Sequence, residues 1–117
     1  MFRTSHKDYA CLQNILESIH KIKQYSNEFD DADQFYEHTK SFDAVMMNFV
    51  VIGEMAEKLS DKLIEETQNN IDWYKIRGFR NIIAHNYFGI DAEEVWQIIQ
   101  NNIPELEKNI QKIISIY

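Results

Sequence analysis

The chain has 117 residues, of which 44% are hydrophobic, three are glycine and one is proline. So few turn residues disfavour an all-β protein and favour helices. The formal net charge of −7 argues against a general nucleic-acid binder with a broad basic face, although it leaves room for a small local basic site. The length is typical of one domain, so we expect residues 1–117 to form a single helical domain.

Three features predict a cytoplasmic protein. The single cysteine, Cys11, excludes an internal disulfide and suits a reducing compartment. Its neighbours, DYACLQNIL, favour a core position on a helix over a nucleophile. The first residues, MFRTSHKDYA, lack the apolar region of a signal peptide, and no apolar run approaches the ~18–20 residues of a membrane span. We therefore expect no membrane association.

The first predicted helix covers residues 5–26, where apolar side chains follow one helix face. The acidic stretch NEFDDADQ then predicts a loop or a helix start, followed by a short helical turn near residues 35–40. A second long helix is predicted over residues 41–66, with Ser41 as its N-cap. Gly53 inside it costs about 1 kcal/mol relative to alanine. A close approach of another helix would explain that glycine.

The polar stretch TQNNID predicts a loop before a third helix over residues 72–86. Asp91 with Glu94 resembles a capping box and predicts the start of a fourth helix. Pro104 should break or restart that helix, because proline lacks the N–H that a helix interior needs.

Together the periodic segments predict an all-α fold, a bundle of four to five helices running up and down, with the last long helix broken near Pro104. Four apolar stripes on so short a chain can leave apolar surface uncovered. Met46, Met47 and Met55 are therefore either core residues or part of a dimer face.

The sequence predicts no metal site. Glu17 and His20 form one E-x-x-H pair, but a di-iron bundle needs two such pairs and two further glutamates. His6 and His38 have no partners at ligand spacing. Glu54 is a carboxylate in a mostly apolar helix, and a structural ion pair or exposure at the helix surface is favoured over a direct chemical role.

Charge is unevenly distributed along the chain. Residues 73–90 contain three cations, Lys75, Arg77 and Arg80, and no acid, whereas the other 99 residues contain nine cations and nineteen acids. A negatively charged partner would be steered toward this segment.

The third helix places its polar groups on different sides. At about 100° per residue, Ile76, Phe79 and Ile83 form one stripe, with Arg80 and Tyr87 at its border. His85 lies roughly 140° from Arg80 and faces away from the core. The arginine and the histidine would therefore act from two sides of one phosphate, or beside a second copy of the chain.

The residue types suit one particular reaction. An arginine binds phosphate with two hydrogen bonds and stabilises developing charge. A histidine titrates near neutrality and acts as a general acid or base. Together they suffice to cleave RNA without a metal, through attack of the 2′-hydroxyl on the adjacent phosphorus. On spacing alone, a surface pair or a helix-end cap is favoured over this reaction.

The segment Arg80-Asn-Ile-Ile-Ala-His85-Asn-Tyr87 matches the pattern R-x4-H-x-Y. With WYKIRGFRNIIAHNYFGID, VWQIIQNNIPEL and VIGEMAEKLS around it, nearly the whole chain resembles the HepT-like toxins of the HEPN superfamily. The resemblance implies a small all-α protein that dimerises, with the motifs of both subunits lining a shared cleft. Many relatives are metal-independent endoribonucleases that act as toxins beside a minimal nucleotidyltransferase antitoxin.

The resemblance also implies roles for individual residues. Arg80 would bind the scissile phosphate, His85 would be the general acid and base, and Tyr87 would receive AMP from ATP through the antitoxin, which silences the nuclease. Cleavage itself would need no cofactor. Further expected site residues are Asn81, Asn86, Arg77 and Lys75 as substrate contacts and Glu54 as structural support.

The leading hypothesis is a homodimeric ribonuclease toxin that cuts tRNA or mRNA, with higher assembly left open. The alternative is a non-catalytic helical module that binds a nucleotide or partner and docks onto a nucleotidyltransferase. A purely structural bundle is the third.

Overall fold

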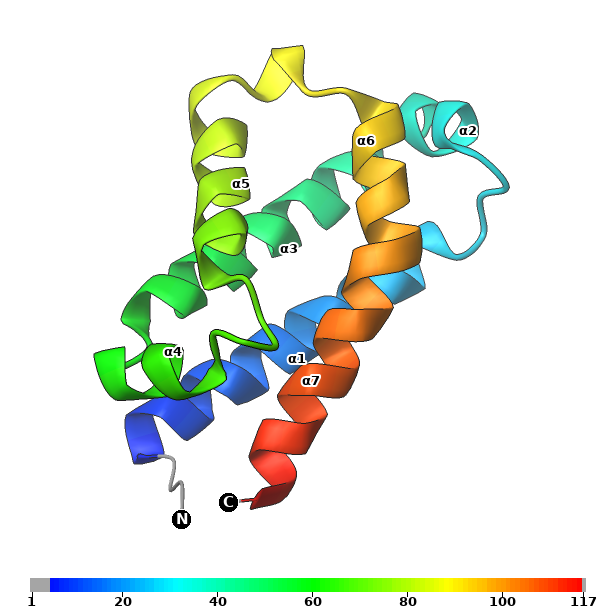
Figure 1. Ribbon diagram of the computed structural model, residues 1–117. Coiled ribbons are helices and arrows are strands. Elements are labelled where there is room, and N and C mark those ends of the chain that lie inside the picture. Colours follow the sequence, from blue (N-terminus) through cyan, green and yellow to red (C-terminus); the bar gives the residue numbers. More distant parts are fainter. Residues whose placement is uncertain (1–4, 117) are drawn as a thin grey trace.

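The computed structural model describes residues 5–116, and every regular element in this range is helical (Figure 1). The elements are α1 (His6–Ser26), α2 (Ala32–Glu37), α3 (Thr39–Lys58), α4 (Asp61–Thr67), α5 (Trp73–His85), the 3₁₀ turn η1 (Tyr87–Gly89), α6 (Ala92–Gln97), the π-helical segment η2 (Ile98–Asn102) and α7 (Ile103–Ile116). The predicted all-α fold is confirmed.

The core lies around α1 and α3, which pack along each other in opposite directions (Figure 1). α5 packs on α3, and α7 packs on α1. Each fully buried leucine or isoleucine contributes roughly 1.5–3 kcal/mol to folding. The largest fully buried side chains of α1 and α3 are Leu12, Ile15, Ile19, Ile22, Val45 and Met46. Cys11 is also buried, as predicted.

The predicted helix over residues 41–66 is wrong, because α3 ends at Lys58 and α4 begins at Asp61. Ser60 is the N-cap of α4, and its hydroxyl accepts from the N–H of Leu63 at 3.2 Å. The buried carboxylate of Asp8, in the first turn of α1, accepts from the N–H of Ser60 at 2.8 Å and from its hydroxyl at 2.5 Å. These bonds satisfy polar groups between α3 and α4 that have no partner within either helix.

The start of α3 also differs from the prediction. The N-cap is His38, whose Nδ1 accepts from the N–H of Ser41 at 3.3 Å, so Ser41 lies inside the helix. The short turn expected near residues 35–40 is α2, which begins earlier, with Asp31 as its N-cap. A histidine side chain at this position supplies the acceptor that a hydroxyl was expected to supply.

The last helical run is not broken at Pro104. α6, η2 and α7 follow one another without interruption, and Pro104 is the second residue of α7 (Figure 1). The N–H of Ile103 bonds to the carbonyl of Ile98, five residues earlier. This wider π turn accommodates a proline that lacks an N–H and crowds the preceding turn. Asp91 is the N-cap of α6 as predicted, but its carboxylate accepts from the N–H of Glu93 rather than Glu94.

The motif considered for a metal is used in ion pairs. His20 contacts Glu107 of α7 at 2.9 Å, and Glu17 contacts Lys21 at 3.5 Å. Lys23 also bonds to Glu107 at 2.8 Å, and the pKa of that carboxyl is lowered mainly by this hydrogen bond. Residues 5–116 contain no cluster of three or more metal-binding side chains.

The methionines have different environments. Met46 is buried, Met55 packs partly buried against the core, and Met47 is exposed. Within the described residues, no helix is long and apolar enough to cross a membrane.

Candidate active site

The N-terminal end of α5 is anchored by a buried tryptophan. The carboxylate of Asp72 caps the helix by accepting from the N–H of Lys75 at 3.0 Å. The indole Nε1 of Trp73 donates to Thr67 Oγ1 at 2.8 Å, and that hydroxyl donates to the carbonyl of Leu63 at 2.7 Å. Because these groups are buried and paired, the base of α5 is fixed against the end of α4.

α5 crosses α3 at Gly53. A Cβ added to Gly53 would lie 2.2 Å from Cβ of Arg80, which is far too close for two carbon atoms. The close helix approach predicted from this glycine is therefore confirmed. Gly53 allows Arg80 to lie directly on α3.

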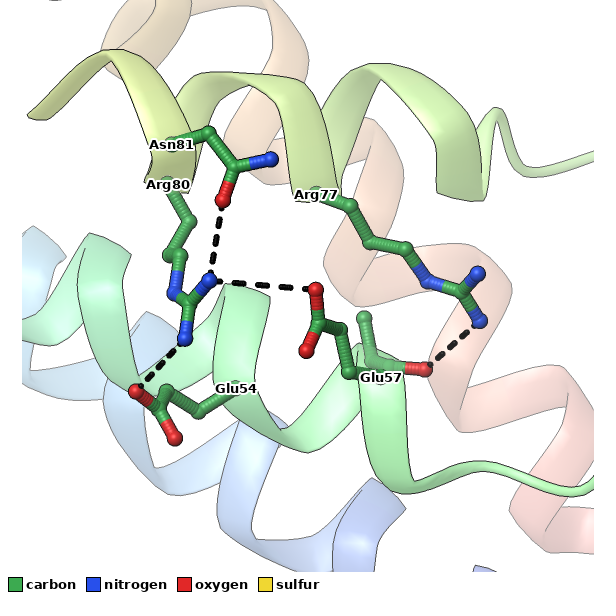
Figure 2. A network of polar contacts seen from close by, with 6 residues as sticks. Glu54, Glu57, Arg77, Arg80 and Asn81 are labelled. Atoms are coloured by element: carbon green, nitrogen blue, oxygen red, sulfur yellow. Dashed lines mark hydrogen bonds and ion pairs between the residues drawn. The ribbon is translucent and has the colours of Figure 1, made fainter. Parts of the chain in front are cut away.

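Arg80 is held by acidic and polar groups (Figure 2). Its Nη2 donates to Glu54 Oε1 at 3.0 Å, and its Nη1 donates to Asn81 Oδ1 at 2.9 Å. Glu57 lies 3.8 Å from the same Nη1. The hydrogen bond to Glu54 is the main cause that raises the pKa of Arg80. The ion-pair interpretation of Glu54 is confirmed, and the Arg80 side chain keeps 25% of its surface exposed.

Arg77 points to a different place (Figure 2). Its Nη2 donates to the carbonyl of Ala56, in the last turn of α3, at 3.1 Å. Its Nε is buried and has no partner in the part of the chain that the structure describes. Arg77 therefore satisfies the end of α3, as cationic side chains at helix C-termini commonly do. Lys75 is exposed and lines a groove away from the Arg80 contacts.

That groove separates α5 from the run of α6, η2 and α7. It has a volume of about 570 Å³ and is floored by Phe49 and Ile52 of α3. Its walls carry Ile76 and Phe79 on one side and Ile98 and Leu106 on the other.

Tyr87 follows α5 in η1, and its ring lies against Phe42 and Phe88 with centroid distances of 6.2 and 5.7 Å. Its hydroxyl donates to the carboxylate of Asp43 near the start of α3. Partial burial, followed by the contact with Asp43, raises the pKa of Tyr87 well above the ordinary value of 10. The hydroxyl is therefore protonated at neutral pH.

His85, the last residue of α5, is exposed, and its side chain makes no hydrogen bond or ion pair with other residues of the described chain. Arg80 is turned toward α3 instead, so the structure does not bring the two together. Ile82 and Phe88, close to His85 in sequence, are 56% and 98% exposed. Asn86, also exposed, ends α5.

The charge separation read from the sequence does not persist in space. Residues 73–90 contain no acid, yet Glu54 and Glu57 of α3 lie against Arg80, and Asp43 lies against Tyr87. Sequence reasoning missed Asp43 and Glu57. The signal was their spacing. Residues 43, 54 and 57 share one face of an ideal helix, because eleven residues make just over three turns and three residues make slightly less than one.

The family model described as Ribonuclease HepT-like matches residues 15–113, which include the whole motif. The chain belongs to the HepT-like ribonuclease family. This confirms the resemblance and the predicted enzyme class, a ribonuclease of the HEPN type.

Individual relatives agree with this assignment. The chain is 28% identical over 111 residues to a "probable ribonuclease HepT" of Thermococcus cleftensis, covering 95% of this chain and 97% of that protein. It is 29% identical over 102 residues to a "putative RNase" of Methanocaldococcus jannaschii, covering 87% and 92%. A longer protein of that organism, named for both a gamma-glutamylcyclotransferase and an RNase, is 34% identical over 106 residues, which are 89% of this chain and 46% of that protein. No solved structure matches the chain.

Proposed function

We propose that this member of the HepT-like ribonuclease family is a metal-independent endoribonuclease and the toxin of a toxin–antitoxin pair. The observation that carries the proposal is the intact motif at the end of α5, with Arg80 fixed on α3 and His85 exposed and free of partners within residues 5–116. A fixed cation and an accessible titrating group are what phosphodiester cleavage requires.

The proposed reaction uses the RNA's own nucleophile. His85 accepts the proton of a 2′-hydroxyl, whose oxygen forms a bond to the adjacent phosphorus. The bond from phosphorus to the 5′-oxygen breaks, and that oxygen takes up a proton from an imidazolium. Arg80 stabilises the extra charge on the phosphorus centre. The products are a 2′,3′-cyclic phosphate and a 5′-hydroxyl.

A second copy of the chain completes the proposed site. Within one chain Arg80 is directed to α3, while His85 is exposed and its side chain has no contact with Arg80 among the hydrogen bonds and ion pairs of residues 5–116. We propose that His85 of each subunit faces the partner's motif across a shared cleft, where Ile82 and Phe88 supply exposed apolar surface. Asn81 and Asn86 would contact the RNA at the rim, whereas Arg77 and Lys75 are turned to other neighbours or lie in the separate groove.

Tyr87 is the proposed point of control. A partner nucleotidyltransferase would transfer AMP from ATP to the Tyr87 hydroxyl, and the added bulk and negative charge would oppose the entry of RNA. In this proposal AMP is a covalent modification of the silenced state, cleavage needs no cofactor, and the protein acts on tRNA or mRNA in the cytoplasm.

The test is cleavage of total RNA in EDTA by the purified wild type, Arg80→Ala and His85→Ala. We expect fragments with cyclic phosphate ends from the wild type, and a loss of about 10²–10⁴-fold in rate from each variant. Equal cleavage by all three proteins would exclude these two residues as the catalytic pair.

One observation favours the alternative, a non-catalytic module that docks onto a nucleotidyltransferase: the guanidinium of Arg80 is already paired with Glu54 and Glu57. In that case the wild type would cleave no RNA while still forming a stable complex with the partner enzyme. Copurification together with the cleavage assay separates the two functions.

A further inference from the structure

We propose that Asp43 is the group that orients the Tyr87 hydroxyl for modification and accepts its proton during transfer of the nucleotide. This inference rests on the proposed adenylylation of Tyr87. It assigns to the toxin chain itself a role that could otherwise belong wholly to the partner enzyme.

The first support is the contact itself. Asp43 lies near the start of α3 and Tyr87 lies in η1, so the tertiary fold brings together two residues 44 positions apart. The tyrosine hydroxyl donates to Asp43 Oδ1. Within residues 5–116 no cation pairs with Asp43, so no ion pair competes with the tyrosine hydroxyl for this carboxylate.

The second support is the packing of the tyrosine ring. Phe42, next to Asp43 in α3, contacts the Tyr87 ring, and Tyr36 packs edge-on against Phe42 at 5.1 Å. Phe88 covers another side of the ring and is itself 98% exposed. The ring is held on α3 while the hydroxyl and Asp43 lie at the surface, where a nucleotide can reach them.

The third support is the chemistry of the hydroxyl. Its raised pKa means that almost no phenolate exists at neutral pH, so an attacking Tyr87 must lose its proton as the new bond forms. A base within hydrogen-bond distance serves this purpose, and Asp43 occupies that position.

The transfer forms one bond to phosphorus and breaks another. Oη of Tyr87 forms a bond to the α-phosphorus of a nucleoside triphosphate, and the bond between that phosphorus and the oxygen bridging to the β-phosphorus breaks. Pyrophosphate leaves with the electron pair of that bond. The phenolic proton moves to the carboxylate of Asp43 and is then released to water. The oxygen that bridges the ring and phosphorus in the product ester has no proton, so its hydrogen bond to Asp43 is lost.

The experiment measures the rate at which the full chain gains one AMP, by intact mass, with the partner nucleotidyltransferase and saturating ATP. Wild type is compared with Asp43→Asn, Asp43→Ala and Tyr87→Phe. The matched control is Asp33→Asn, which removes an exposed acid from α2. We expect no gain for Tyr87→Phe and a rate near that of wild type for the control. The rate of Asp43→Asn should fall by about 10²-fold or more.

The pH profile separates a base from a structural support. The deficit of Asp43→Asn should be largest near pH 6 and should shrink as the pH rises toward the tyrosine pKa, because the phenolate then forms without a base. An unchanged rate in Asp43→Asn, or a loss whose pH profile has the wild-type shape, would overturn the inference and leave the base to the partner. Absence of labelling in the wild type would instead overturn the proposed modification of Tyr87.

Discussion

At the scale of single residues, Glu54 and Glu57 compete with an RNA phosphate for the guanidinium of Arg80. Glu54 and Glu57 hold Arg80 in place, yet their charges also repel an incoming RNA phosphate. The two effects can be separated because glutamine keeps an acceptor for the guanidinium while it removes the charge.

We therefore expect Glu54→Gln to bind a non-cleavable RNA about two- to fivefold more tightly at low salt, the range typical of an exposed charge pair. The gain should vanish near 1 M salt because of screening. Fluorescence anisotropy titrations at two salt concentrations measure it. Glu28→Gln, in the loop between α1 and α2, makes the same change in net charge and should show little effect. Weaker binding by Glu54→Gln would mean that orientation of Arg80 outweighs repulsion.

The titration of Tyr87 makes the stability of the fold depend on pH in the alkaline range. Its pKa is higher in the folded chain than the ordinary value of 10, so the folded state retains the proton more strongly than the unfolded state. This contribution to stability is fully present below pH 10 and is lost as the pH rises above it. Between pH 9 and pH 11, we expect the melting temperature of the wild type to fall more than that of Tyr87→Phe. Parallel curves for the two proteins would contradict the assigned shift.

At the scale of elements, the crossing of α3 and α5 sets the position of the motif. Gly53→Ala places a methyl group against Arg80, so α5 must move. We expect a net loss of about 1–3 kcal/mol in the free energy of unfolding, despite the better helix propensity of alanine. Denaturant unfolding measures it, and RNA cleavage should fall as well.

Gly78→Ala is the matched control on α5, because a Cβ there meets nothing within 4 Å. Helix propensity alone should then stabilise the protein by about 0.5–1 kcal/mol. If both variants were stabilised to the same extent, the close crossing at Gly53 could not be correct.

The sequence predicted most of the elements but not all of their boundaries. Periodic apolar residues located α1 and α5 almost to the residue, and Gly53 indicated the crossing. The break between α3 and α4 was missed because the apolar period continues across Ser60. What stops α3 is a carboxylate from the first turn of α1, 52 residues away. A local pattern carries no information about such a contact.

The candidate site was predictable to a similar extent. The motif supplied Arg80, His85 and Tyr87, and Glu54 was correctly expected in an ion pair. Asp43 and Glu57 escaped notice because acids on an exposed helix face are common and become meaningful only once α5 is placed beside them.

At the scale of the whole molecule, the proposed dimer makes a prediction about mixtures. If a site joins Arg80 of one subunit to His85 of the other, a heterodimer of Arg80→Ala and His85→Ala contains one complete site. Random mixing of the two inactive variants should then restore activity to about a quarter of the wild-type value, since half of the dimers are mixed and each has one working site.

The measurement is RNA cleavage by the two variants before and after they are unfolded and refolded together. Each variant refolded alone is the control and should stay inactive. If the mixture also stayed inactive although size-exclusion chromatography showed dimers, the two residues would have to act within one chain.

The placement of the two tryptophans gives this protein a built-in optical probe. Trp73 is buried at the foot of α5, whereas Trp96 lies in α6 with its ring 5.7 Å from that of Phe35. Trp73 therefore reports on α5 and Trp96 on the C-terminal helical run. In a Trp96→Phe background the emission spectrum would follow the motif helix alone. The arrival of RNA, of a second subunit or of an AMP group could then be timed without attaching a dye.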